Sequence, residues 1–98
     1  MPDLSDGSAQ LFNRPCLAKR VRLQIDPVSG KPVLLNQEAV ILLNRTGYEI
    51  LEQCDGTRTL TEIIEELGNR YAIAKTTLTQ DVSQYVEKLN QKGLLQWI

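Results

Sequence analysis

The stretch that decides the fold is "QCDGTRTLTEI", residues 53–63, which ends one helix and begins another within a few residues. Gly56 follows Asp55 where a helix ends, because glycine readily takes the left-handed conformation that closes a last turn. Thr59 and Glu62 have the T-x-x-E spacing of a capping box, in which each side chain accepts a hydrogen bond from the other residue's backbone N–H. The stretch therefore predicts a helix-turn-helix junction.

Apolar residues at helical spacing predict three helices around this junction. The first is centred on Tyr48, Ile50, Leu51 and Cys54, the second on Leu60, Ile63, Ile64, Leu67 and Tyr71, and the third on Leu78, Val82, Tyr85, Val86 and Leu89. We expect the third helix to begin at Thr76 or Thr77, with Gln80 completing a second capping box, and to stop at Gly93. Residues 94–98 then form a short extended segment, either a wing strand or a plug on the core.

Three short strands precede the helices. Residues 20–26 alternate apolar and polar side chains, residues 27–30 have turn composition, and residues 32–35 and 39–43 are apolar runs. Strands this close in sequence usually pair as an antiparallel meander. The predicted fold is therefore α+β and winged helix-turn-helix-like, a three-stranded antiparallel meander followed by three helices, with the third strand at or next to an edge.

The third strand is apolar on both faces. Val40 and Leu42 project to one side, whereas Ala39, Ile41 and Leu43 project to the other. A small sheet backed by helices needs only one apolar face, so we expect something to cover the second. An edge strand also offers unpaired N–H and C=O groups to another chain. The alternatives are a deeper core, a homodimer, or a peptide added as an extra strand.

The length and composition indicate one small domain. The chain has 98 residues, of which 42% are apolar and 23% are charged, as is usual for a globular protein. We predict a flexible N-terminal arm over residues 1–16 and a folded domain over residues 17–98. No apolar run approaches the roughly 20 residues of a membrane helix, and the first ten residues lack a signal segment, so we expect a cytoplasmic protein.

Charge is divided unevenly along the chain. Residues 14–45 carry six basic and two acidic side chains, a net charge of +4, whereas residues 46–98 carry five basic and eight acidic side chains, a net charge of −3. Arg20 and Arg22 in the first strand are either ordinary surface charge or contacts for an acidic peptide. The front of the chain is therefore basic and the helical part acidic.

The third helix gives little support for DNA binding. It carries Asp81, Glu87, Lys88 and Lys92, with no arginine, so these charges cancel. Non-specific DNA affinity comes almost wholly from neutralised phosphates. A degenerate winged-helix DNA-binding regulator is nevertheless the alternative function, and it would show DNA binding that collapses with added salt.

Catalytic and metal sites are not expected either. The chain has no histidine, no G-x-S-x-G motif and no C-x-x-C spacing. Cys54 near a helix C-terminus has no accompanying base, so we interpret it as a small buried apolar residue rather than a nucleophile. Cys16 has no assigned role. We therefore predict a protein that is not an enzyme and has no metal or cofactor.

Two long runs carry a resemblance to a known family. "LLNRTGYEILEQCDGTRTLTEIIEELGNRY" (residues 42–71), followed by "TLTQDVSQYVEKLNQKGLL" (residues 77–95), resembles the PqqD family of pyrroloquinoline quinone (PQQ) biosynthesis proteins over roughly residues 17–96. Its most telling parts are Leu43-Asn44 with Thr46-Gly47, Asp55-Gly56, Thr59 with Glu62-Ile63, and Asp81-Val82 leading to Leu89 and Gly93.

This resemblance implies a RiPP recognition element, a winged-helix module that binds a ribosomally made precursor peptide. It implies a chaperone that presents the peptide PqqA to the radical SAM enzyme PqqE, which joins a glutamate to a tyrosine, without itself catalysing the reaction. A recognition element of another peptide pathway, or a carrier of the quinone product, is an alternative. We expect no nucleic-acid or membrane partner, and either a monomer or a strand-swapped homodimer.

The resemblance also implies where the peptide lies, between the third strand and the third helix. The implied peptide-binding residues are Ala39, Val40, Ile41, Leu42 and Leu43 on the strand and Thr79, Val82, Ser83 and Val86 on the helix. The edge argument above leads to the same strand independently.

Overall fold

The computed structural model describes residues 11–37 and 39–98, which form five strands and three helices. In chain order these are β1 (Pro15–Leu17), β2 (Arg22–Ile25), β3 (Pro32–Asn36), β4 (Ala39–Leu42), α1 (Arg45–Glu52), α2 (Leu60–Tyr71), α3 (Lys75–Gln91) and β5 (Leu95–Trp97). The predicted α+β class, with a three-stranded antiparallel sheet followed by three helices, is confirmed. Residues 1–10 of the predicted arm lie outside the described residues.

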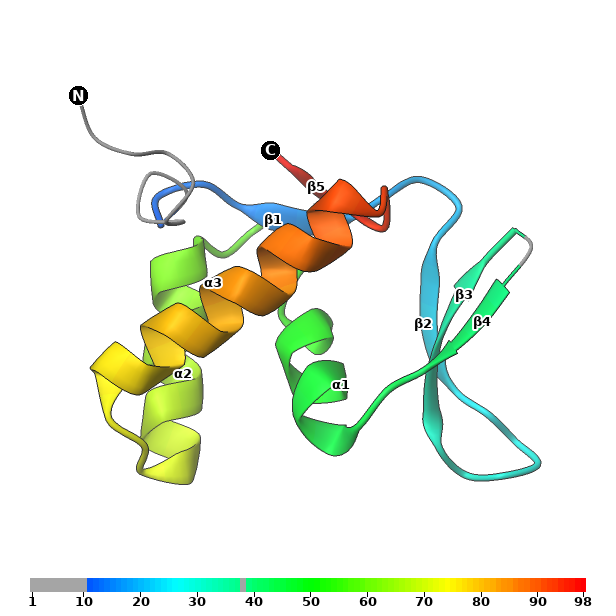
Figure 1. Ribbon diagram of the computed structural model, residues 1–98, viewed down its shortest axis with the longest axis horizontal. Helices are drawn as coiled ribbons and strands as arrows, with labels where there is room; N and C mark the ends of the chain where they lie inside the picture. The colour runs from blue at the N-terminus through cyan, green and yellow to red at the C-terminus, as the bar shows by residue number, and fades with distance from the viewer. Residues whose placement is uncertain (1–10, 38) are drawn as a thin grey trace.

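The larger sheet is the predicted meander, with strand order β2-β3-β4. Leu34 at its centre lies opposite Leu23 of β2 and Ile41 of β4, and both pairings are antiparallel. Figure 1 shows this sheet at one end of an elongated molecule, whose extents are 45 × 29 × 20 Å, with the helices at the other end. β4 is therefore an edge strand with a free outer side among the described residues.

A second, two-stranded sheet was not predicted in full. β5 confirms the short extended segment at the C-terminus, but its partner is β1, with Pro15 opposite Trp97. The predicted boundary at residue 16 falls inside β1, and Pro15 is buried. The backbone N–H of Gly56 donates to the carbonyl of Pro15 at 3.0 Å, and that of Leu60 donates to Asn13 at 3.0 Å. Residues 13–16 are therefore part of the packed fold.

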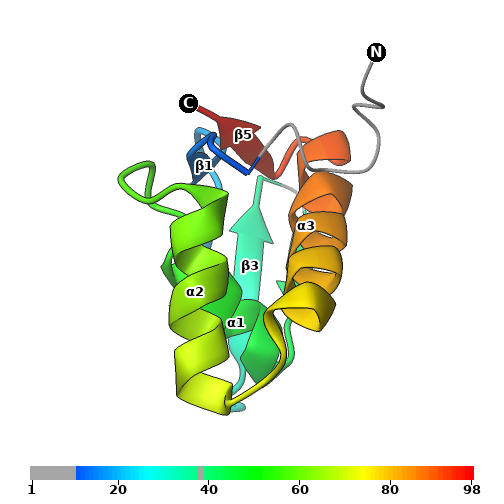
Figure 2. The same ribbon diagram turned by 90° about the vertical axis from the view of Figure 1, so that its left-hand side faces the viewer.

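The helices enclose the core on the inner face of the sheet. Figure 2 shows α2 and α3 side by side with β3 behind them, and the side chains of Leu34, Ile63 and Val86 are fully buried. The predicted alternation in residues 20–26 holds at Val21, which is buried, Arg22, which is exposed, and Leu23, which packs against the core. It fails at Ile25, which is 47% exposed. The sheet thus supplies one face of a core whose other sides are helical.

The capping box of the junction at residues 53–63 forms as predicted. The N–H of Glu62 donates to Thr59 Oγ1 at 3.2 Å, and the N–H of Thr59 donates to Glu62 Oε1 at 2.8 Å. Gly56 has the left-handed φ of +82°, but the prediction that it closes the last turn of the first helix is wrong, because α1 ends at Glu52 with Gln53 as its C-cap. The second capping box is wrong, because α3 begins earlier, after Ala74, which has no side-chain oxygen to accept a capping hydrogen bond.

Candidate functional site

The outer edge of β4 offers free backbone groups. The N–H of Leu43 donates to the carbonyl of Pro32 on β3 at 3.0 Å. In an antiparallel pair alternate residues point their N–H and C=O toward the partner strand, so Ala39 and Ile41 face β3 as Leu43 does. Val40 and Leu42 therefore point their backbone groups to the open side, where another chain can pair with them.

The outer face of the sheet is apolar and open at β4. Val40 is 65% exposed and Leu42 is 70% exposed, whereas Ile41 and Leu43 pack against the core. Val33, opposite Leu42 on the central strand, is buried on this outer face. The second apolar face predicted for β4 thus exists, and no part of the chain that the structure describes covers Val40 or Leu42.

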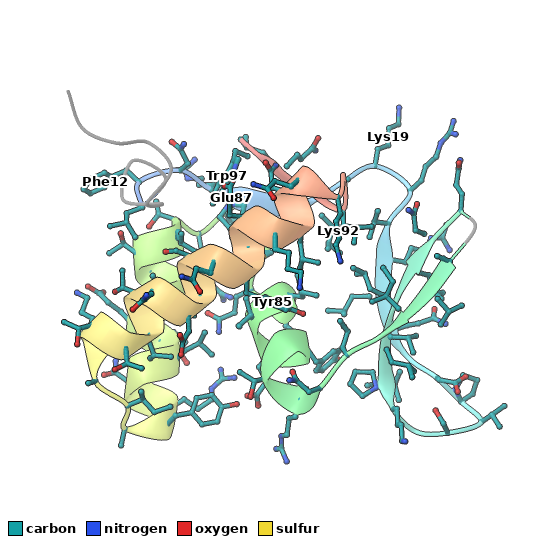
Figure 3. All side chains as sticks on the ribbon, in the orientation of Figure 1. Phe12, Lys19, Tyr85, Glu87, Lys92 and Trp97 are labelled. Carbon is teal, nitrogen blue, oxygen red and sulfur yellow. The ribbon has the colours of Figure 1, made fainter. Side chains whose placement is uncertain are left out.

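A groove runs between β4 and the C-terminal half of α3, with a hollow of about 220 Å³. The strand side is lined by Ile41, Leu42, Leu43 and Asn44, and the helix side by Tyr85, Lys88, Leu89 and Lys92. Figure 3 shows Tyr85 between α3 and α1, and Lys92 at the end of α3 nearer the sheet. The free edge of β4 and an apolar hollow therefore lie next to each other.

The predicted helix residues lie on α3 but do not line this groove. Val82, Ser83 and Val86 are buried, with exposed fractions of 1%, 6% and 0%. Thr79 is half-buried and donates its hydroxyl to the carbonyl of Lys75 at 2.7 Å. None of these four lines the hollow, whereas Ile41, Leu42 and Leu43 do.

Tyr85, Lys88 and Lys92 are the groove residues that the sequence reasoning missed. They follow one another at i, i+3 and i+7, so they form a stripe along α3 beside the buried one. The spacing was visible in the sequence, but the stripe mixes one aromatic residue with two lysines. Apolar periodicity therefore assigned Tyr85 to the core, and the two lysines entered only the charge balance of the helix.

Tyr85 forms the wall of the groove because Gly47 leaves room for it. A Cβ atom on Gly47 would lie 2.5 Å from Tyr85 Oη, far inside van der Waals contact, and 3.2 Å from Tyr85 Cζ, a few tenths of an ångström too close. Asn44 caps α1 at this point, accepting a hydrogen bond from the N–H of Gly47 at 2.7 Å. Burial raises the pKa of the Tyr85 hydroxyl, so the side chain is a neutral phenol at physiological pH. The first turn of α1 thus fixes the position of Tyr85.

The groove is positively charged. Its eight lining residues include two lysines and no carboxylate, although the whole chain has a net charge of −1. Neither Lys88 nor Lys92 forms an ion pair within the described residues. The site therefore combines a free strand edge, an apolar hollow and two unpaired cations, which suits an extended peptide with apolar and acidic side chains.

Cys54, the residue that could have indicated nucleophilic catalysis, has a structural role. Cys54 is buried, donates its thiol to the carbonyl of Ile50 at 3.3 Å, and has its pKa raised by burial to about 12, so it is a neutral thiol at physiological pH. Within residues 11–37 and 39–98, no cluster of three or more cysteine, aspartate or glutamate side chains could hold a metal ion. No described helix has both the length and the apolar character needed to cross a bilayer.

Comparison with known proteins gives consistent matches over most of the chain. The family model of Coenzyme PQQ synthesis protein D (PqqD) matches residues 32–95. A "PqqA binding protein" of Rhodopseudomonas palustris strain TIE-1 is 34% identical over 83 residues, covering 85% of this chain and 81% of the relative. One from Xanthomonas axonopodis pv. citri strain 306 is 35% identical over 83 residues, covering 85% and 90%.

A solved structure matches the fold as well. It is the solution NMR structure of the PqqD truncation of Methylobacterium extorquens PqqCD, described as a functional and stand-alone RiPP recognition element. It superimposes on this chain with a TM-score of 0.71 and 32% sequence identity, covering 84% of this chain and 87% of the other.

Proposed function

This chain belongs to the PqqD family, and on that premise we propose that it is a peptide chaperone of PQQ biosynthesis, binding the precursor peptide PqqA and presenting it to the radical SAM enzyme PqqE. The peptide adds to β4 as a further strand and lies in the groove between β4 and α3. The relatives named for PqqA binding and the recognition element of similar fold support the ligand. The free edge of β4 supports the mode of binding.

The observation that carries this proposal is the direction of the backbone groups of Val40 and Leu42. Both point to the open side of β4, and the apolar hollow lies beside them. In strand addition, main-chain hydrogen bonds supply affinity and neighbouring pockets select side chains. β4 and the hollow together provide both.

The side chains of the groove indicate what the peptide carries. A hollow of about 220 Å³ is smaller than the ~300–1,000 Å³ of typical small-molecule sites, so it suits one large apolar side chain better than a quinone. Leu42, Leu43 and Tyr85 would contact that side chain, and Lys88 and Lys92 would attract a carboxylate next to it. We propose these helix contacts in place of Thr79, Val82, Ser83 and Val86, of which the last three are buried on the core-facing side of α3.

The experiment that tests the proposal is an NMR titration of ¹⁵N-labelled protein with synthetic PqqA peptide. We expect saturable shifts in residues 39–43 and 85–92, with smaller changes in α2, which lies on the far side of α3. A peptide of the same composition in scrambled order is the matched control. Absence of shifts at high peptide concentration, or equal shifts with the scrambled peptide, would contradict the proposal.

A further inference from the structure

The outer face of the β2-β3-β4 sheet changes from polar to apolar between its two edges. Residues directly opposite each other in paired strands project to the same face, so the outer face carries two rows of side chains. The rows are Arg22-Leu35-Val40 and Gln24-Val33-Leu42. Each row begins with an exposed polar side chain on β2 and ends with an exposed apolar side chain on β4. The exposed apolar surface is therefore confined to the β4 edge.

The two edge strands differ in a way that favours pairing at β4 alone. Polar and charged side chains on an edge strand discourage pairing with another chain, and Arg22 and Gln24 are exposed on β2. The open face of a small antiparallel sheet is normally polar, yet Val40 and Leu42 on β4 are 65% and 70% exposed. They are not isolated surface residues, because each lies next to an apolar residue of β3 in its row. A contiguous apolar patch of this kind indicates an interaction site.

Strand addition determines where the side chains of the added peptide lie. The backbone groups of Val40 and Leu42 point to the open side of β4, so two peptide residues come to lie opposite them. Residues opposite each other have their Cβ atoms about 4.5–5.5 Å apart on the same face of the sheet. The side chains of these two peptide residues therefore cover Val40 and Leu42 on the outer face. The peptide residue between them, opposite Ile41, projects to the inner face, where the groove lies.

The size of the patch also favours a single strand over a second copy of the chain. A standard dimer interface buries about 800 Å² on each partner. Two exposed apolar side chains beside a polar β2 edge supply far less apolar surface than that. One added strand, in contrast, places one side chain over each of them.

We infer that the outer face at β4 is a second recognition surface for the bound peptide, and that it selects apolar side chains opposite Val40 and Leu42. The inference rests on the proposed function, since it requires the peptide to lie on β4. Val40 is β-branched, and aromatic and β-branched residues form favourable cross-strand pairs with such a residue. The peptide class is therefore a segment with three consecutive apolar residues. The middle one enters the hollow of about 220 Å³, and the other two cover the sheet.

Val40→Thr tests this surface while leaving the edge N–H in place. Threonine keeps the β-branch of valine but replaces a methyl group by a hydroxyl, and Val40 is not among the described residues that line the hollow. The affinity for PqqA, measured by calorimetry, should fall about two- to fivefold, the contribution of one cross-strand pair. Val28→Thr is the matched control, because Val28 is 94% exposed in the turn between β2 and β3. This variant should keep the wild-type affinity.

A serine scan of PqqA tests the same surface from the side of the peptide. We expect affinity losses at three consecutive positions, because both faces of the added strand are in contact with the protein. Losses only at every second position would show that the groove alone selects the peptide, and would overturn the inference. Equal PqqA affinities of Val40→Thr and Val28→Thr would do so as well. So would a peptide-free dimer that Val40→Thr converts to a monomer in ultracentrifugation, since a second copy would then cover this face. Failure of the wild-type chain to bind PqqA would instead refute the proposed function.

Discussion

Proline substitution at two neighbouring positions of β4 tests strand addition directly. Val40 points its N–H to the open edge, whereas Ile41 points its N–H to β3. Proline removes the N–H in either case and is tolerated at strand edges but not within a ladder. We therefore expect Val40→Pro to impair peptide binding and Ile41→Pro to impair folding.

The two magnitudes differ enough to be separated. Loss of one main-chain hydrogen bond to the peptide costs about 0.5–1.5 kcal/mol, which weakens binding roughly 2- to 13-fold. The proline ring also occupies the space through which the peptide strand approaches, so the upper part of this range is expected. Ile41→Pro leaves the carbonyl of the buried Leu34 without its ladder partner, a cost of about 1–3 kcal/mol. For a domain of this size that lowers the melting temperature by at least ~4 °C.

Isothermal titration calorimetry with PqqA and thermal unfolding by circular dichroism measure the two effects. Val40→Ala is the matched control, because it removes the exposed side chain but keeps the edge N–H. Val40→Ala should therefore bind more tightly than Val40→Pro. A folded Val40→Pro variant with the affinity of Val40→Ala would refute strand addition on this edge.

Three further predictions concern Tyr85, the capping box and the buried thiol. Gly47→Ala should lower the free energy of unfolding by about 1–3 kcal/mol through overpacking and should weaken PqqA binding. Because the closest clash is with Tyr85 Oη, adding Tyr85→Phe should restore part of the stability and part of the affinity, both measured by calorimetry. The pKa of Glu62 is lowered because its carboxylate accepts a hydrogen bond from the N–H of Thr59. The stabilising contribution of this carboxylate is therefore fully present above about pH 4.5 and is lost as the pH falls through the lower pKa of the folded state. Glu62→Gln should thus make the melting temperature depend less on pH in the acid range. Cys54 should resist iodoacetamide at about pH 8 in the native protein and react after unfolding in urea, as mass spectrometry would show, since burial raises its pKa to about 12.

The parts of the fold that the sequence predicts are those encoded by local patterns. The capping box at Thr59 and Glu62 and the alternation around Leu23 each lie within a few residues, and both form as expected. β1 has only three residues, and its partner β5 lies about eighty residues away. β1 forms because residues 15–17 and 95–97 meet in space, and no local pattern in "PCL" indicates that pairing.

The site was predictable only as far as the backbone determines it. The edge position of β4 follows from strand order, and the free groups of Val40 and Leu42 then follow from alternation. The helix side depends on how α3 is rotated about its axis, which is set by packing against α2. If α3 were rotated about its axis by the angle of about one residue, Val86, which is buried, would face β4 in place of Tyr85.

The distribution of positive charge on α3 bears on whether this winged-helix scaffold binds a peptide or DNA. Lys75 is paired with Glu65 at 3.2 Å, and Lys88 and Lys92 line the groove beside β4. Asp81 is exposed on the same helix. A recognition helix needs its cations on the face that meets the phosphates, because those contacts supply most of the affinity. Here the unpaired cations lie on the flank beside a free strand edge, so the electrostatics of α3 and the hydrogen-bonding capacity of β4 favour the same ligand, an extended peptide with an acidic side chain.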